Sequence, residues 1–334
     1  MDIDCRPILL PSKSRVAGSR FIGEFKFENG GKVPVYDVFS TSALNQLIGH
    51  AKFKNATYGN VYYRGVNGLF NNVMPSIMRK RKYGDAHDLN QIINRICDDD
   101  YFKESLKLKG FIYSKKVEDI KRNKGIKKYN RYRVEALLQH YAGKTRFIDV
   151  VDNHWVAMWM GLQTFHAHGK GNQFCDCRKR ELNIIEIYDL LKSCDSLSSL
   201  PDSKNDFYEY IILIAMPYSS NDIVDGVMES SEFVEVDLRK ALPSIYLRPH
   251  AQHALVVRRR DNNNTENTAS YYDMASQVIG ILRISIDRAS IWLGDGALLT
   301  SDNLFPSPSV DQGYNNLLMH DELFTHPFEI VRYY

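Results

Sequence analysis

One polar stretch, residues 138–149, lies between two of the most apolar segments of the chain and reads Leu-Gln-His-Tyr-Ala-Gly-Lys-Thr-Arg-Phe-Ile-Asp. Before it, apolar residues recur at helical spacing from Val134 to Tyr141, which predicts a helix with one buried face. Gly143 stands where a helix end favours a positive φ. After it, segment 155–160 is apolar on all sides and predicts a helix within a core. A connector between buried helices must satisfy its own backbone groups, so this stretch is either a structural connection or the floor of a site.

The composition is that of an ordinary globular protein. The 334 residues are 44% hydrophobic and 25% charged, enough for one large domain or two. A net charge of +3 is too small to indicate nucleic-acid binding by itself. No apolar run reaches membrane-spanning length, the N-terminus lacks a signal-peptide pattern, and five cysteines without framework spacing fit a reducing compartment. We therefore expect a cytoplasmic protein with no membrane partner.

The expected fold class is α+β, because helical patterns dominate the first half and strand patterns the second. Ser40 is an expected helix cap, a helix follows over 43–48, and a charged helical region covers 83–132. Polar loops are expected over 166–181 and 261–267. Strands are expected at 21–27, 60–63, 183–188, 210–216, 233–236, 252–258 and 280–286.

The domain organisation follows from this order of elements. We expect a central, mostly antiparallel sheet, with helices inserted after the strand at 60–63. Residues 1–35 would form an N-terminal extension, and residues 36–334 would form a single domain.

Several short motifs follow one another along the chain. In order they are Tyr62-Tyr63-Arg64-Gly65, Met74-Pro75-Ser76-Ile77-Met78-Arg79, the 138–149 stretch with Ala157 beyond it, Arg248-Pro249-His250-Ala251-Gln252-His253-Ala254 and Leu304-Phe305-Pro306. Together they resemble the FRG domain, a family named for its (Phe/Tyr)-Arg-Gly sequence. The family continues with Pro-x-x-x-Arg, Gln-His-(Tyr/His)-Gly-x-Thr-Arg-(Leu/Phe)-Leu-Asp and Arg-x-x-x-Gln-x-Gly elements. Ala142-Gly143 replaces a single Gly of many members, and Ala254 replaces a Gly, but neither departure removes a polar functional group.

The order Arg, His-Tyr, Gln is also similar, more distantly, to the three-part signature of ADP-ribosyltransferase-like folds. In those folds, an Arg or His holds the nicotinamide side of NAD, a second element shapes the nicotinamide pocket, and a late Glu or Gln contacts the ribose or the acceptor. The similarity implies a bacterial NAD-binding ADP-ribosyltransferase or NAD glycohydrolase-like effector, such as a toxin or phage-defence component, with a protein acceptor. The implied catalytic residues are Arg64, His140 and Gln252, and the implied NAD-binding residues are Arg64, Gly65, His140, Tyr141 and Thr145.

The chemistry of these side chains agrees with that implication. Arg64, next to Gly65 at a strand end, could clamp a phosphate or ribose while the backbone lets a ligand approach. His140 and Tyr141 could stack on nicotinamide or donate to a ribose hydroxyl. Gln252 can orient a hydroxyl but is no general base, so a transferase would need a neighbouring acid or a strongly nucleophilic acceptor.

Structural roles remain open for the same residues. Arg64 could pair with Asp149, and Thr145, Arg146 and Asp149 could hold strand and helix together. His140 could be a satisfied core histidine, and Gln252 could bond a backbone edge. A non-catalytic module that binds a ligand or protein in the same polar cleft is therefore the alternative function.

Segment 115–133 is strongly basic, with nine Lys or Arg against two acids. A solvated helix explains such a run, and binding of nucleic-acid phosphates is the other interpretation.

A His-x-His and a Cys-x-Cys pair follow the apolar helix: His166, His168, Cys175 and Cys177. Only one residue separates the two members of each pair, which is unfavourable for tetrahedral coordination of zinc by both, so no metal site is assigned.

Overall fold

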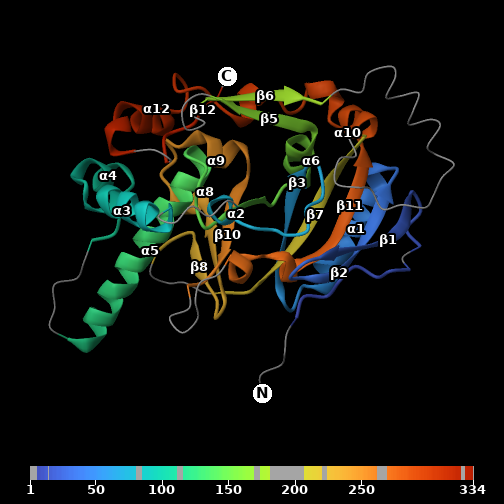
Figure 1. Cartoon of the computed structure of the whole chain (residues 1–334), viewed down its shortest axis with the longest axis horizontal. Helices are drawn as coiled ribbons and strands as arrows, with labels where there is room; N and C mark the ends of the chain where they lie inside the picture. Colours follow the sequence, from blue (N-terminus) through green and yellow to red (C-terminus); the bar gives the residue numbers. More distant parts are fainter. Residues whose placement is uncertain are drawn as a thin grey trace.

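The computed structural model describes residues 6–13, 15–79, 85–110, 116–168, 174–180, 207–219, 224–261, 269–324 and 328–333. Nine strands form one large sheet, and three more form a small sheet along one edge of the molecule (Figure 1). In spatial order the large sheet contains β1 (Ser19–Phe27), β2 (Gly31–Val38), β11 (Val278–Ser285), β7 (Tyr208–Pro217), β3 (Gly59–Val66), β4 (Ile148–Val151), β10 (Ala254–Arg259), β9 (Phe233–Asp237) and β8 (Val227–Glu229). The small sheet contains β12 (Arg332–Tyr333), β6 (Phe174–Lys179) and β5 (Gln163–His168).

Within the large sheet, neighbouring strands are antiparallel except β2 and β11, which confirms the expected α+β class with a mostly antiparallel sheet. The helices are α1 (Thr41–Lys54), α2 (Ser76–Arg79), α3 (Asp85–Asp98), α4 (Asp100–Ser105), α5 (Val117–Tyr141), α6 (His154–Leu162), α8 (Leu238–Ala241), α9 (Leu247–Ala251), α10 (Ile286–Trp292), α11 (Ser301–Leu304) and α12 (Gln312–Met319). Short 3-10 turns are η2 (Ala269–Tyr272), η3 (Ala275–Gln277), η4 (Gly294–Gly296) and η5 (Asp321–Leu323). As expected, helices α2 to α5 are inserted between β3 and β4. No helix in the described ranges has both the length and the apolar character needed to cross a bilayer.

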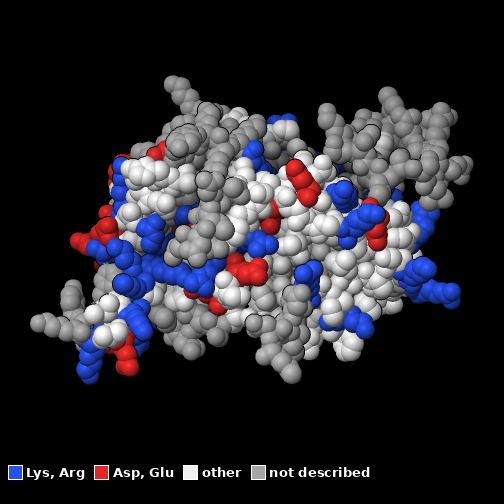
Figure 2. Space-filling view, turned by 60° about the horizontal axis from the view of Figure 1, so that its bottom comes forward, with Lys and Arg blue, Asp and Glu red and all other residues white. Residues whose placement is uncertain are grey.

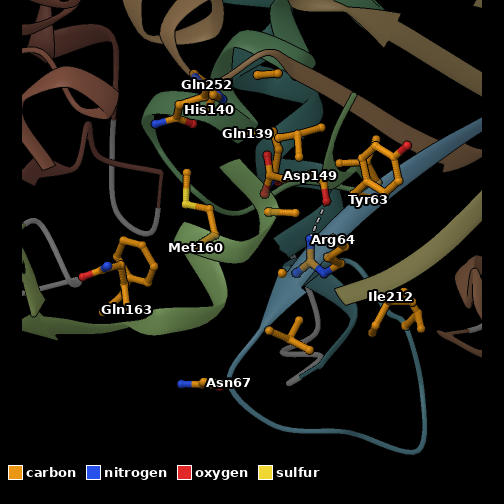
Figure 3. A pocket seen from close by; sticks show the side chains of 18 of the residues that line it. Tyr63, Arg64, Asn67, Gln139, His140, Asp149, Met160, Gln163, Ile212 and Gln252 are labelled. Carbon is orange, nitrogen blue, oxygen red and sulfur yellow. Dashed lines mark hydrogen bonds between the residues drawn. The ribbon is translucent and has the colours of Figure 1, made fainter. Parts of the chain in front are cut away.

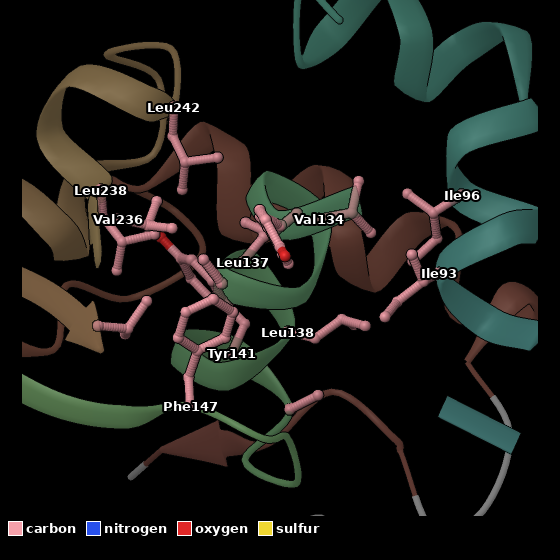
Figure 4. Close-up of a cluster of buried hydrophobic side chains, with 14 of the residues drawn as sticks. Ile93, Ile96, Val134, Leu137, Leu138, Tyr141, Phe147, Val236, Leu238 and Leu242 are labelled. Carbon is pink, nitrogen blue, oxygen red and sulfur yellow. The ribbon is translucent and has the colours of Figure 1, made fainter. Parts of the chain in front are cut away.

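The last turn of helix α5 contains the first residues of the polar stretch and lies in the core. Its apolar face packs against Ile93 of α3 on one side and Leu238 of α8 on the other (Figure 4). The helix ends as predicted, because Gly143 adopts a φ of 84° and its N–H donates to the carbonyl of Leu138 at 2.9 Å. His140 and Tyr141 thus occupy the last turn of a buried helix.

Local sequence patterns predicted the positions of most of the other helices and strands. Ser40 caps α1, accepting a hydrogen bond from the N–H of Ala43. The expected strand over 252–258 begins two residues later, at Ala254. The expected strand at 183–188 and most of the loop at 261–267 lie outside the described residues.

Two expectations about chain organisation differ from the structure. Part of the expected polar loop at 166–181 forms the hairpin of β5 and β6, because β6 also pairs with β12 near the C-terminus. A partner so distant in sequence leaves no local signal. Strands β1 and β2, which start within the expected N-terminal extension 1–35, form one side of the large sheet.

The large sheet is split between β3 and β4. These strands share one paired position, Tyr63 with Val151, whereas β3 pairs with β7 over its whole length. β4 is in turn paired with β10 over four residues. The strands therefore diverge beyond Tyr63, and the divergence opens space inside the sheet.

A buried ion network ties α5 to the turn that follows it and to β10. Nη2 of Arg146 lies 2.7 Å from Oε2 of Glu135, and Nη1 of Arg258, in β10, lies 3.0 Å from the same oxygen. Glu135 is 2% exposed and Arg258 is fully buried. Burial raises the pKa of Glu135, but the two arginines outweigh it and leave the pKa below its usual value.

We predict that Glu135→Gln lowers the free energy of unfolding by about 3 kcal/mol at pH 7, because it leaves two buried guanidinium groups less well compensated. Urea unfolding followed by circular dichroism measures this. The deficit should shrink as the pH falls below about 4.5, because the lowered pKa of Glu135 gives stability that is lost on protonation. The exposed Glu104→Gln should cost less than about 0.5 kcal/mol. Equal effects of both variants would contradict the network's role.

Candidate functional site

A cavity of about 470 Å³ opens where β3 and β4 diverge (Figure 3). This volume falls within the range of small-molecule sites. The wall is built from β3, the last turn of α5, β4, α6, β5 and the segment just before β10. Polar lining residues include Arg64, Arg79, Gln139, His140, Asp149, Asn67, Gln163 and Gln252. Arg64, His140 and Gln252, which lie far apart in the sequence, are therefore brought to one cavity.

Arg64 spans the split between the strands. Its Nη1 donates to the backbone carbonyl of Asp149 at 2.6 Å (Figure 3). The expected pairing of the two residues thus runs through the backbone oxygen of Asp149. Burial lowers the pKa of Arg64, and the carboxylate of Asp149 opposes that effect.

Gly65 is required by the close approach of α6. A Cβ at this position would lie 1.7 Å from the carbonyl oxygen of Ala157, which is backbone and cannot move aside. Gly65 therefore lets the buried helix pack directly on β3 beside Arg64.

His140 lines the cavity as a neutral imidazole. Burial, followed by the nearby charge of Arg248, lowers its pKa to about 3. Its Nε2 is buried without a hydrogen-bond partner in the described part of the chain. Arg248 donates from Nη1 to the His140 carbonyl at 3.1 Å, and this hydrogen bond stabilises the C-terminal end of α5. A neutral ring with one free nitrogen can accept or donate a single hydrogen bond.

Gln252 follows α9 and precedes β10. Its Nε2 donates to the carbonyl of Leu304 at 2.6 Å. The amide thus bonds the backbone, as expected if Gln252 has a structural role. It still lines the cavity. Its position fits an orienting role, and its amide supplies no base.

Tyr141 and Thr145 lie behind the cavity wall. The Tyr141 hydroxyl donates to Asp311 at 2.8 Å, and its ring lies 4.4 Å from the guanidinium of Arg248. Thr145 is fully buried, and its hydroxyl donates to Gln139 Oε1 at 2.6 Å. Tyr141 and Thr145 therefore do not face the cavity; they support the residues that do.

The cavity is also lined by polar residues that were not singled out as ligand contacts from the sequence, among them Arg79, Gln139 and Asp149. The signal for them was present, because all three belong to the FRG-like motifs. Asp149 was instead grouped with Arg146 as a structural residue. Arg146 does have a structural partner in Glu135, but the alternation of β4 turns Asp149 away from the core side occupied by Ile148 and Val150.

Aromatic rings close the cavity on the side of the small sheet. Phe165 of β5, Phe305 and Tyr333 of β12 line it. Phe305 and Tyr333 stack with ring centroids 4.6 Å apart, and the Arg248 guanidinium lies 4.5 Å from the Tyr333 ring. This wall depends on the pairing of β12 with β6, so the sequence pattern alone could not reveal it.

The hairpin of β5 and β6 separates the His and Cys pairs. His166 is opposite Asp176 and Ala167 is opposite Cys175. Residues opposite each other share a face and successive residues alternate, so the histidines lie on one face and the cysteines on the other. In the described ranges no three His, Cys, Asp or Glu side chains cluster in a way that could hold a metal.

We predict that the neutral His140 makes stability depend on pH. Its folded pKa lies below the unfolded value of 6.5, so the stability it gives is present above pH 6.5 and is lost as the pH falls. Between pH 7 and pH 5 the loss should be about 2 kcal/mol larger in the wild type than in His140→Gln. Urea titrations at both pH values measure it, with the exposed His166→Asn as control. An unchanged pH dependence in His140→Gln would contradict the burial of a neutral ring.

The comparisons with known proteins bear on the same segment. A family model described as the FRG domain matches residues 59–170, from β3 through α6 to the end of β5. No curated protein and no solved structure matches the chain. The more distant similarity to ADP-ribosyltransferase-like folds therefore stays a prediction. The match includes Arg64, Arg79 and the whole 138–149 stretch, and it shows that this chain contains an FRG domain.

Proposed function

We propose that this protein binds NAD in the cavity between β3 and β4 and breaks the bond between nicotinamide and ribose. The ADP-ribose passes to water or to a protein acceptor, as in an NAD-consuming effector of the toxin or phage-defence type. The observation that carries the proposal is the convergence of Arg64, His140 and Gln252 on one cavity.

The charges of the cavity suit a dinucleotide. Arg64 and Arg79 both line it, and each lies close enough to Asp149 for the carboxylate to affect its pKa. Two guanidinium groups can bind the diphosphate through paired N–H donors. The single acidic side chain among the described lining residues leaves a net positive charge for an anionic ligand.

The uncharged part of the wall suits the rings. Phe70, Phe165, Phe305 and Tyr333 offer aromatic faces on which nicotinamide or adenine can stack. The neutral His140 can bond the nicotinamide amide or a ribose hydroxyl without repelling the positive nicotinamide ring.

We predict that Arg64→Lys weakens NAD binding by about 10- to 100-fold, because lysine keeps the charge but loses the planar pair of donors. Isothermal titration calorimetry measures the Kd, and a thermal melt verifies folding. Arg95→Lys, at an exposed position on α3, is the matched control and should bind like the wild type.

The enzymatic part is tested by incubating the wild type with NAD labelled in the adenosine moiety, with and without cell lysate. Release of nicotinamide or transfer of label to protein is expected. Binding without product would identify a non-catalytic module in the same cleft. Absence of binding, product and label transfer would overturn the proposed function.

A second candidate function concerns the first half of α5. No residue of this helix before Ile126 is buried, and this half projects from the body of the molecule (Figure 1). Lys and Arg side chains gather on the same side of the molecule (Figure 2). Four exposed cations have no carboxylate partner among the described residues: Lys121, Arg122, Lys124 and Lys127. Such a projecting basic helix favours binding of nucleic-acid phosphates.

We predict that a fluorescent 20-nucleotide single strand binds with a log–log salt slope of about −3, since four phosphate contacts each contribute about −0.7. Fluorescence anisotropy between 50 and 200 mM NaCl measures the slope. Reversing the four cations to Glu should abolish binding. A control with the same charge change, placed elsewhere, should retain it: Lys13→Glu, Arg15→Glu, Lys32→Glu and Lys54→Glu. Equal loss in both variants would show that net charge, rather than this helix, attracts the strand.

A further inference from the structure

We propose that Asp149 is the catalytic carboxylate of the cavity and that Gln139 and Thr145 are positioning residues that hold it. The inference rests on the proposed function and names the group that performs its chemical step. It answers the difficulty left by Gln252, whose amide is bound to Leu304 and cannot act as a base.

Asp149 is the one acid among the described residues that line the cavity. It is also the one residue of β4 that is not fully buried. Its neighbours Ile148 and Val150 pack into the core on one face of the strand, so the alternation of the strand directs Asp149 to the other face. Figure 3 shows Asp149 next to Gln139, with Arg64 below them.

A chain of hydrogen bonds fixes the carboxylate. Gln139 Nε2 donates to Asp149 Oδ2 at 2.6 Å, and Thr145 Oγ1 donates to Gln139 Oε1 at 2.6 Å. Thr145 Oγ1 in turn accepts from the N–H of Phe147 at 3.1 Å.

The two ends of this chain determine its direction. A backbone N–H can only donate, and an ionised carboxylate can only accept. Gln139 must therefore turn its NH₂ group toward Asp149 and its oxygen toward Thr145, and the hydroxyl of Thr145 must supply the proton between them. The orientation of the Gln139 amide is thus set by its partners, and the buried Thr145 serves the cavity from behind.

The surroundings also adjust the proton affinity of Asp149. Burial raises the pKa of Asp149, while Arg64, the hydrogen bond from Gln139 and Arg79 lower it, and burial prevails. A carboxylate with a raised pKa is a better base near neutral pH than an exposed one.

The chemical step follows from this placement. The C1′–N bond of NAD breaks, and its electron pair leaves with nicotinamide, which becomes neutral. Positive charge develops on C1′ and the ring oxygen of the ribose, where the Asp149 carboxylate stabilises it. A water oxygen then bonds to C1′, and its proton passes to Asp149 and on to solvent. NAD⁺ and water thus give ADP-ribose, nicotinamide and one proton.

The first test compares Asp149→Asn with the wild type. We expect nicotinamide release to fall by about 10²- to 10⁴-fold while the Kd for NAD changes less than threefold, because the carboxylate acts on the transition state. Asp287→Asn, on the exposed side of α10, is the matched control and should turn over normally.

The second test addresses the positioning residues through the pH profile of kcat. Thr145→Val frees the Gln139 amide to turn, so Asp149 loses a hydrogen bond that lowers its pKa. The acidic limb of the profile should shift to higher pH, and Thr145→Ser should restore it. A purely structural role of Thr145 would reduce activity without moving the limb.

The outcomes separate the two levels of the proposal. A wild type that neither binds nor cleaves NAD would overturn the proposed function, and the assignment of Asp149 would fall with it. An active wild type together with an equally active Asp149→Asn protein would overturn the assignment alone. An acidic limb that stays in place in Thr145→Val would remove the positioning role.

Discussion

The split between β3 and β4 is the constraint on which the candidate site depends. A continuous antiparallel pair would fill this part of the sheet with backbone hydrogen bonds and leave no room for a ligand. Here the two strands meet only at Tyr63 and Val151, and the Arg64 guanidinium donates to the backbone carbonyl of Asp149. One side chain thus links β3 to β4 beside the split while it also lines the cavity.

The 138–149 stretch acts both as a structural connection and as part of the cavity wall. On its core side, Arg146 joins Glu135 in a buried ion network. On its cavity side, Gln139, His140 and Asp149 line the space. Buried polar groups of this kind are costly unless they are fully bonded, so the connection and the wall must form together. The same twelve residues therefore contribute both to stability and to the site.

Local patterns predicted the local parts of this arrangement. Helix α5, its end at Gly143 and the strand that carries Arg64 follow from periodicity and turn chemistry, which depend on nearby residues. The motifs also singled out Arg64, His140 and Gln252, and all three line the cavity. The sequence did not predict that Asp149 lines the cavity while Tyr141 does not, because the direction of each side chain depends on packing against α12, Arg248 and β10. The aromatic wall was missed for a similar reason, since Tyr333 arrives through a strand pairing across more than 150 residues.

We propose that the cavity at the sheet split binds NAD with the reacting bond at Asp149. A crystal structure of the Asp149→Asn protein grown with saturating NAD is the decisive experiment. We expect the diphosphate against Arg64 and Arg79, with C1′ of the nicotinamide ribose facing the side chain at position 149. An empty cavity, or a dinucleotide bound elsewhere on the molecule, would contradict it.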